Sequence, residues 1–210
     1  MLDVFNTPNK VGANVQYFYQ DSMWTKPRGA NQIYMMLIGG GGNDSVTLGG
    51  GSGSITTWWG SASNVPDSLI IHPSTGNADN TTVSYLGTST SVLIQANAAT
   101  TSTGGTAFTA NQFCNTGFFQ SVAGQTGSSI AVTASTITFL GAGSHTASQG
   151  ATGNYGYSIP SVGSGFFQTS PIIVGVGSTG GTTARNGPIG CGAGGTGGLG
   201  GPGLVIIASY

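Results

Sequence analysis

Charge is scarce in this sequence of 210 residues, of which 4% are charged, against about 25% in an average globular domain. There are four Lys or Arg and five acidic residues, and all five are Asp. Nucleic-acid-binding proteins gain affinity by neutralising phosphates with Lys and Arg. A formal net charge of −1 with four basic residues therefore argues against a nucleic-acid partner. Low charge also leaves little repulsion between copies, which favours assembly.

Long hydrophobic runs are also missing. The most apolar stretch, residues 33–38, is far shorter than the roughly 20 residues of a membrane-spanning helix. The first ten residues, MLDVFNTPNK, lack the cationic and apolar regions of a secretory signal. We therefore expect no membrane insertion and no signal peptide. Hydrophobic residues still make up 38% of the chain, so a core can form.

Residues that carry catalysis or bind metals are few. Cys114 and Cys191 match neither a disulfide framework nor a zinc motif, and we expect two buried free thiols. His72 and His145 have no acidic partner nearby in the sequence, although one from a distant segment stays open. Residues 175–180 match G-x-G-x-x-G, but the helix and acidic residue of a dinucleotide site do not follow. We predict no catalytic residue, no metal and no cofactor, and thus not an enzyme.

Helix-forming residues are depleted, because Glu is absent and Gly, Ser, Thr and Asn interrupt almost every window. Short apolar segments bounded by turn residues predict nine strands instead. These are residues 15–19, 33–38, 54–58, 68–72, 82–86, 91–95, 130–140, 172–176 and 204–209. We predict an all-β fold, an antiparallel β-sandwich or jelly-roll-like domain with glycine-rich loops or polyglycine-II-like segments.

Two features refine this prediction. Residues 33–38 and 204–207 are continuously apolar, which indicates strands buried on both faces at the centre of the sheet system. The apolar positions in residues 130–140 change parity once, which predicts a β-bulge.

Glycine, at 39 residues, is concentrated in residues 39–53 and 175–203. Residues 194–202 repeat Gly-Gly-X with a period of three, which is the period of the polyproline II helix. Without side chains, neighbouring segments of this kind could approach closely and hydrogen-bond laterally. The glycines of this predicted structural tract are Gly194, Gly195, Gly197, Gly198, Gly200 and Gly201. A flexible linker is the alternative.

Three aromatic doublets stand out in the sequence. Neighbouring residues on a strand point to opposite faces, so one member of each doublet could be exposed. Exposed aromatic side chains are typical of protein interfaces and receptor contacts. The candidates are Trp58, Trp59, Phe118, Phe119, Phe166 and Phe167. The alternative is that both members are covered within a thick sandwich.

The order of these motifs resembles the glycine-rich domain of bacteriophage tail fibre and other virion proteins. The resemblance is carried by the following features of the sequence: the WTKPRGA turn at residues 24–30, the strand at 33–38, the glycine runs at 39–42 and 49–53, the Pro–Ser–Leu strand at 65–71, and the closing glycine tract and strand at 200–207.

This resemblance implies a structural protein located in the virion, with residues 24–210 as the glycine-rich β domain and residues 1–23 as an N-terminal arm or first strand. Because only residues 1–23 precede the domain, we expect a capsid, vertex or decoration protein as an alternative to a tail protein. Its partners would be copies of itself, for example in a trimer, and other virion proteins. The alternative function is a phage receptor-binding adhesin that recognises a host surface glycan or protein. An enzyme that degrades glycans is a third hypothesis.

Overall fold

The computed structural model describes residues 14–44, 49–86, 91–124, 126–127, 134–139, 143–148, 186–187, 189–193 and 197–210. These ranges contain eleven strands and two short 3-10 helices, and no α-helix. The strands are β1 (Asn14–Phe18), β2 (Ser22–Thr25), β3 (Gln32–Ile38), β4 (Ile55–Ser61), β5 (Ser68–His72), β6 (Thr81–Tyr85), β7 (Val92–Ala96), β8 (Phe118–Val122), β9 (Ala134–Phe139), β10 (Gly143–Ser148) and β11 (Leu204–Ser209). The 3-10 helices are η1 (Ala62–Asn64) and η2 (Cys114–Thr116).

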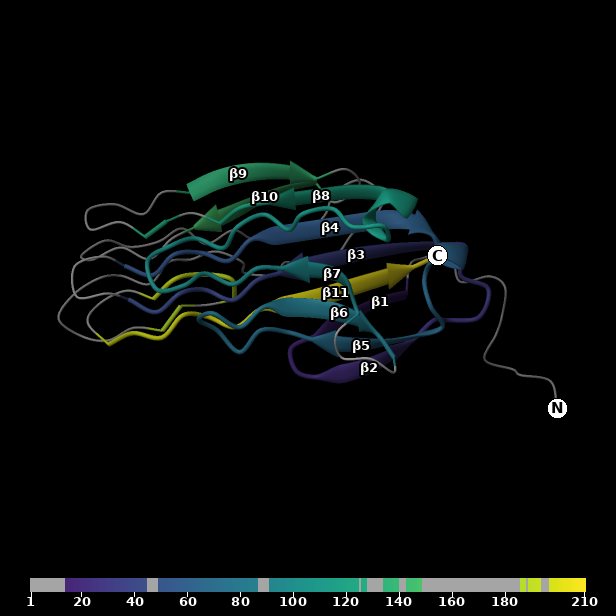
Figure 1. Ribbon diagram of the computed structural model, residues 1–210, viewed down its shortest axis with the longest axis horizontal. Helices are drawn as coiled ribbons and strands as arrows, with labels where there is room; N and C mark the ends of the chain where they lie inside the picture. The colour runs from purple at the N-terminus through teal and green to yellow at the C-terminus, as the bar shows by residue number, and fades with distance from the viewer. Residues whose placement is uncertain are drawn as a thin grey trace.

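The strands form a β-sandwich in which every described pair is antiparallel. A five-stranded sheet has the order β1-β11-β3-β4-β8, and a four-stranded sheet has the order β2-β5-β6-β7. Strands β9 and β10 pair with each other. In Figure 1 the strands of the two larger sheets lie towards the C-terminus, on the right of the view, and extended segments continue from them towards the left. The predicted all-β antiparallel fold is confirmed.

The core lies on both faces of the central strands β3 and β11. One apolar cluster fills the space between the two sheets and includes Met35, Leu37 and Val205. A second cluster covers the opposite face of the five-stranded sheet and includes Met36 and Ile206. All of these side chains are at most 1% exposed. The continuous apolar runs therefore predicted correctly that these strands are buried on both faces and lie side by side, Ile38 opposite Leu204.

Other strand predictions fail or fall outside the described residues. Strands β2, β8 and β10 are not predicted by the sequence, because they lack an apolar alternation. The sequence predicts a bulge in residues 130–140. For the part of this segment that lies in β9 the prediction is wrong, because β9 pairs with β10 without a register shift. A shift occurs instead between Val83 and Ser84 of β6. The predicted strand at 172–176 lies outside the described residues.

The WTKPRGA turn has a structural basis in the sandwich. Trp24 of β2 is 2% exposed and packs between the sheets. Lys26 donates hydrogen bonds to the carbonyl oxygens of Ala62 (3.1 Å) and Val65 (2.8 Å), which satisfies acceptors at the ends of η1. Gly29 has φ +81°, a left-handed conformation that favours glycine.

Trp58 of β4 and Trp24 are the largest side chains inside the sandwich, and Trp58 is fully buried. Its ring stacks on Phe113 with centroids 4.7 Å apart. Gly60 and Gly117 leave room for the indole, because a Cβ built on either would lie under 3 Å from it. The position of Trp58 therefore depends on two residues that lack side chains.

We predict that Gly117→Ala lowers the free energy of unfolding by about 1–3 kcal/mol, the usual cost of overpacking a closed core. The added methyl carbon would lie 2.8 Å from Cε2 of Trp58, and the stacked Phe113 restricts the movement of the ring. Urea unfolding followed by tryptophan fluorescence measures the change. Asn115→Ala, at an exposed neighbouring position, is the control. Equal stability of the two variants would contradict the packing described here.

Candidate functional site

Two of the three aromatic doublets lie next to each other across strands β4 and β8. Trp58 is opposite Phe119, and Trp59 is opposite Phe118. Trp58 and Phe119 face the core between the sheets. Trp59 is half-buried on the opposite face of the five-stranded sheet, where the Phe118 side chain is 65% exposed. The predicted alternation is present, but nothing in the sequence indicated that the two doublets are neighbours.

Trp59 and Phe118 form a tilted aromatic pair with ring centroids 5.6 Å apart and planes inclined by 30°. The indole Nε1 of Trp59 donates a 3.1 Å hydrogen bond to Oε1 of Gln32. Gln32 lies on β3, diagonally across from Trp59, at a distance that long side chains span. This bond holds the indole in one orientation beside Phe118.

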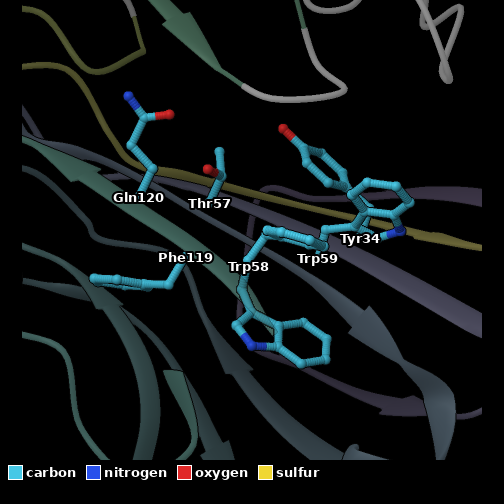
Figure 2. Close-up of a pocket in the computed structure, with 7 residues that line it drawn as sticks. Tyr34, Thr57, Trp58, Trp59, Phe119 and Gln120 are labelled. Carbon is cyan, nitrogen blue, oxygen red and sulfur yellow. The ribbon is translucent and has the colours of Figure 1, made fainter. Parts of the chain in front are cut away.

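Two pockets flank this pair, and both are lined by Trp59 and Phe118. One has a volume of about 190 Å³ and is also lined by Tyr34, Thr57 and Gln120. Figure 2 shows Tyr34, Thr57 and Gln120 on one side of the strands and Trp58 on the other. The second has a volume of about 380 Å³ and is lined by further polar residues and two glycines. We call the aromatic pair with its two pockets the Trp59–Phe118 site.

The second pocket is lined by the residues that begin β3 and end β4. They are Asn31, Gln32, Gly60 and Ser61, joined by Thr116 and Gly117 from the segment before β8. None of the described residues that line either pocket is charged. Burial, together with the nearby Tyr210, raises the pKa of Tyr34, so its hydroxyl stays neutral at physiological pH. The described part of the Trp59–Phe118 site therefore combines aromatic and polar side chains and carries no charge.

The glycine-rich segments form a second candidate region at the other end of the strands. Residues 39–44 follow β3, residues 49–54 precede β4, and residues 197–203 precede β11. Together with residues 97–105 and 189–193 they make up what we call the glycine stack. Its segments lie outside the named strands and bond to one another through backbone N–H and C=O groups.

Residues 39–44 hydrogen-bond to four neighbouring segments at once. Gly39 and Gly42 donate to residues 49–54, and Gly41 donates to Gly201, each at 2.8 Å. Gly40 accepts from residue 99 at 2.9 Å, and Gly42 accepts from residue 193 at 3.0 Å. A strand in a sheet bonds to two neighbours at most, because its side chains occupy the remaining directions. This segment bonds in more directions because it has few side chains.

Close packing explains why glycine is needed here. A Cβ built on Gly41 would overlap the carbonyl oxygen of Cys191, and one on Gly200 would overlap that of Gly41. Residues 39–42 and 49–54 are buried. In the described part of the predicted tract, Gly200 packs against Gly41 and Gly201 bonds to Gly41 and Cys191, which favours a structural tract over a flexible linker.

Of the predicted tract, Gly197, Gly198, Gly200 and Gly201 belong to the stack. Gly194 and Gly195 lie outside the described residues, as do Phe166 and Phe167. The three-residue helix stays a prediction, whereas lateral hydrogen bonding is present.

Polar side chains complete the hydrogen bonding of the stack. The carboxylate of Asp44 accepts from the amide of Gly197 at 3.0 and 3.1 Å, and Oδ1 of Asn43 accepts from Gly200 at 2.9 Å. Oδ1 of Asn77 accepts from Asn43 at 3.2 Å and from Thr101 at 2.6 Å. Asn and Asp side chains replace backbone acceptors in this way at turns.

We predict that Gly41→Ala destabilises the protein by at least the upper end of the about 1–3 kcal/mol typical of overpacking. The neighbour that the methyl group would overlap is backbone, which cannot rotate away as a side chain can. Thermal unfolding of the variant measures the loss. Leu199→Ala is the control within the stack, since Leu199 is 57% exposed. A Gly41→Ala protein as stable as this control would show that the stack does not pack as described.

His72 connects three segments on the four-stranded sheet side. Its Nδ1 lies 2.6 Å from Oδ1 of Asp21, and its Nε2 lies 3.1 Å from Oδ1 of Asp79. Asp79 also accepts from the backbone N–H and the hydroxyl of Thr75. The expectation that His72 has no acidic partner nearby in the sequence is wrong. Asp79 lies seven residues later in the sequence, and the turn after β5 places its carboxylate beside the imidazole.

This arrangement shifts two pKa values in opposite directions. Burial would lower the pKa of His72, but the hydrogen bonds with Asp79 and Asp21 outweigh it and raise the pKa above 6.5. Burial would raise the pKa of Asp79, but hydrogen bonds from Thr75 and His72 outweigh it and lower the pKa below 3.8. The cluster therefore stabilises the fold most between about pH 4 and 6.5, where both groups are charged in the folded and unfolded chain.

We predict that stability falls as the pH rises through the raised pKa of folded His72, because the imidazolium then loses its proton. Below pH 4 the contribution of Asp79 is lost in turn, as the pH falls through its lowered pKa. Unfolding free energies measured at intervals from pH 5.5 to 9 test the first effect. His72→Gln should flatten this part of the profile, and His145→Gln, at the other histidine of the chain, is the control. An unchanged profile in His72→Gln would contradict the assignment.

Cys114 and Cys191 are both buried, and neither forms a disulfide, as predicted. Burial raises the pKa of the Cys114 thiol, which keeps it protonated and unreactive.

Among the described residues, no three His, Cys or acidic side chains are grouped to hold a metal ion. The described part of the chain also contains no helix that is long and apolar enough to cross a membrane.

In comparisons with known proteins, no family model and no curated protein matches this sequence. The resemblance to the glycine-rich virion domain therefore rests on the motifs themselves and stays a prediction.

Proposed function

We propose that this chain is a non-enzymatic structural component of a virus particle, such as a capsid, vertex, decoration or tail protein. It assembles with copies of itself and with other virion proteins. The glycine stack is the observation that carries this proposal. In it, five segments from distant parts of the sequence are tied together by backbone hydrogen bonds. Such a region is held together mainly by its backbone and needs few large side chains, which suits a building element of a particle.

The distribution of charge supports the same role. Lys26 pairs with Asp67 at 2.9 Å, and His72 lies between Asp21 and Asp79, so several of the few charges are used within the chain. Copies of the protein therefore repel one another only weakly. The order of the Trp, Pro and glycine motifs, which resembles that of virion domains, points in the same direction.

A receptor-binding adhesin is the second candidate, and the Trp59–Phe118 site favours it. The glycine stack joins the strands at Ile38, Ile55 and Leu204, whereas the site lies where β3 begins and β4 ends. The two regions are thus at opposite ends of the sandwich. One end would be rigid, and the other would present an exposed aromatic side chain to a host surface.

Self-assembly and incorporation into particles test the structural role. We expect light scattering on the purified protein to show an oligomer that persists on dilution. We expect its peptides to sediment with intact particles in a density gradient, as measured by mass spectrometry. A monomer at high concentration that is also absent from the particle fraction would overturn the proposal. For the adhesin, the measurement is adsorption of the protein to host cells and its loss in Phe118→Ala.

A further inference from the structure

We propose that the Trp59–Phe118 site binds an uncharged pyranose unit of a glycan. The sugar stacks against the exposed Phe118 ring and receives hydrogen bonds from Gln32 and Asn31. This inference rests on the second function proposed above, in which the site contacts a receptor, and it assigns the chemical class of the ligand.

The aromatic pair provides the apolar part of such a site. A pyranose ring has one face of C–H groups and a rim of hydroxyl groups, so it needs an apolar surface edged by hydrogen-bonding groups. Phe118 is 65% exposed, and its contact with Trp59 holds the ring over the sheet. A rigid aromatic side chain contributes contact area with little loss of conformational entropy on binding.

The amide side chains beside the pair provide the polar part. Oε1 of Gln32 accepts from Nε1 of Trp59, so its amide nitrogen is directed to other acceptors. Asn31 also lines the larger pocket. Each of these amides offers two N–H donors, and that of Asn31 also offers an acceptor. Amides and hydroxyls pair well, since a sugar hydroxyl both donates and accepts.

The absence of charge restricts the ligand further. The described residues that line the two pockets include no Lys, Arg, Asp or Glu. A sialylated, sulfated or phosphorylated ligand would lose water around its charge here without gaining an ionic partner. The site therefore selects neutral hexoses and N-acetylhexosamines over acidic sugars.

The size of the site favours a sugar over a second copy of the chain. The larger pocket, at about 380 Å³, is within the about 300–1,000 Å³ common for small-ligand sites. A stable protein interface buries about 1,200–2,000 Å², and among the pocket residues only Phe118 is a large exposed hydrophobic side chain. Binding of one or two sugar units matches this surface.

The test is a glycan array that carries neutral hexose and N-acetylhexosamine oligosaccharides beside sialylated and sulfated ones. The proteins compared are the wild type, Phe118→Ala, Phe118→Trp, Gln32→Ala and the control Tyr85→Ala. Tyr85 is an aromatic residue that is 50% exposed on the other sheet. Thermal unfolding first establishes that each variant folds. Calorimetry with the neutral oligosaccharide that the wild type binds best then gives the affinities.

We expect binding to neutral glycans, about tenfold or more weaker in Phe118→Ala and Gln32→Ala. Phe118→Trp and Tyr85→Ala should bind like the wild type. The sugar assignment is overturned if no neutral glycan binds, if only acidic glycans bind, or if Phe118→Ala binds as tightly as the wild type. It is also overturned if Phe118→Ala only dissociates an oligomer, because the site would then be an interface between copies. If Phe118→Ala abolishes adsorption to cells while the array stays negative, the adhesin proposal stands and the sugar assignment alone fails.

Discussion

Backbone hydrogen bonding between segments without side chains is the constraint on which the rest of the molecule depends. Strand β3 has two bonded neighbours, β11 and β4, but its continuation at residues 39–44 has four. The change occurs where the apolar residues give way to glycine. Fixing each glycine costs about 0.5–1 kcal/mol more than fixing alanine, and bonds in several directions offset this cost. The sandwich is thereby anchored at one end, which leaves the other end to present the Trp59–Phe118 site.

The fold was predictable from sequence where its signals are local. Residues 33–38 and 204–207 are apolar without interruption, so burial on both faces and a central position followed directly. Strand β8 was missed because Phe-Phe-Gln-Ser-Val has no alternation, and its role as a strand comes from pairing with β4. Strand β2 is four residues long and is defined by its pairing with β5. These strands exist because of tertiary partners, which local propensity does not contain.

The candidate site divides in the same way. That Trp58 and Trp59 face opposite sides follows from the two-residue period of a strand. That Trp59 meets Phe118, and that Gln32 binds its indole nitrogen, depends on the registers of three strands, which are set by packing across the whole sheet. Asp21 reaches His72 for a similar reason, since the pairing of β2 with β5 brings the chain before β2 beside the end of β5. In the glycine stack, a period of three indicated lateral bonding but not which segments would bond.

The place of β11 between β1 and β3 has a consequence for biosynthesis. The last strand of the described chain, Leu204–Ser209, lies inside the five-stranded sheet, between β1 and β3. Until residue 209 has left the ribosome, β1 and β3 have no strand to join them, and both apolar clusters lack the side chains that β11 contributes. Contacts between such distant residues make folding slow. The nascent polypeptide therefore remains open to chaperones, and to premature association with other copies, until translation of this strand is complete.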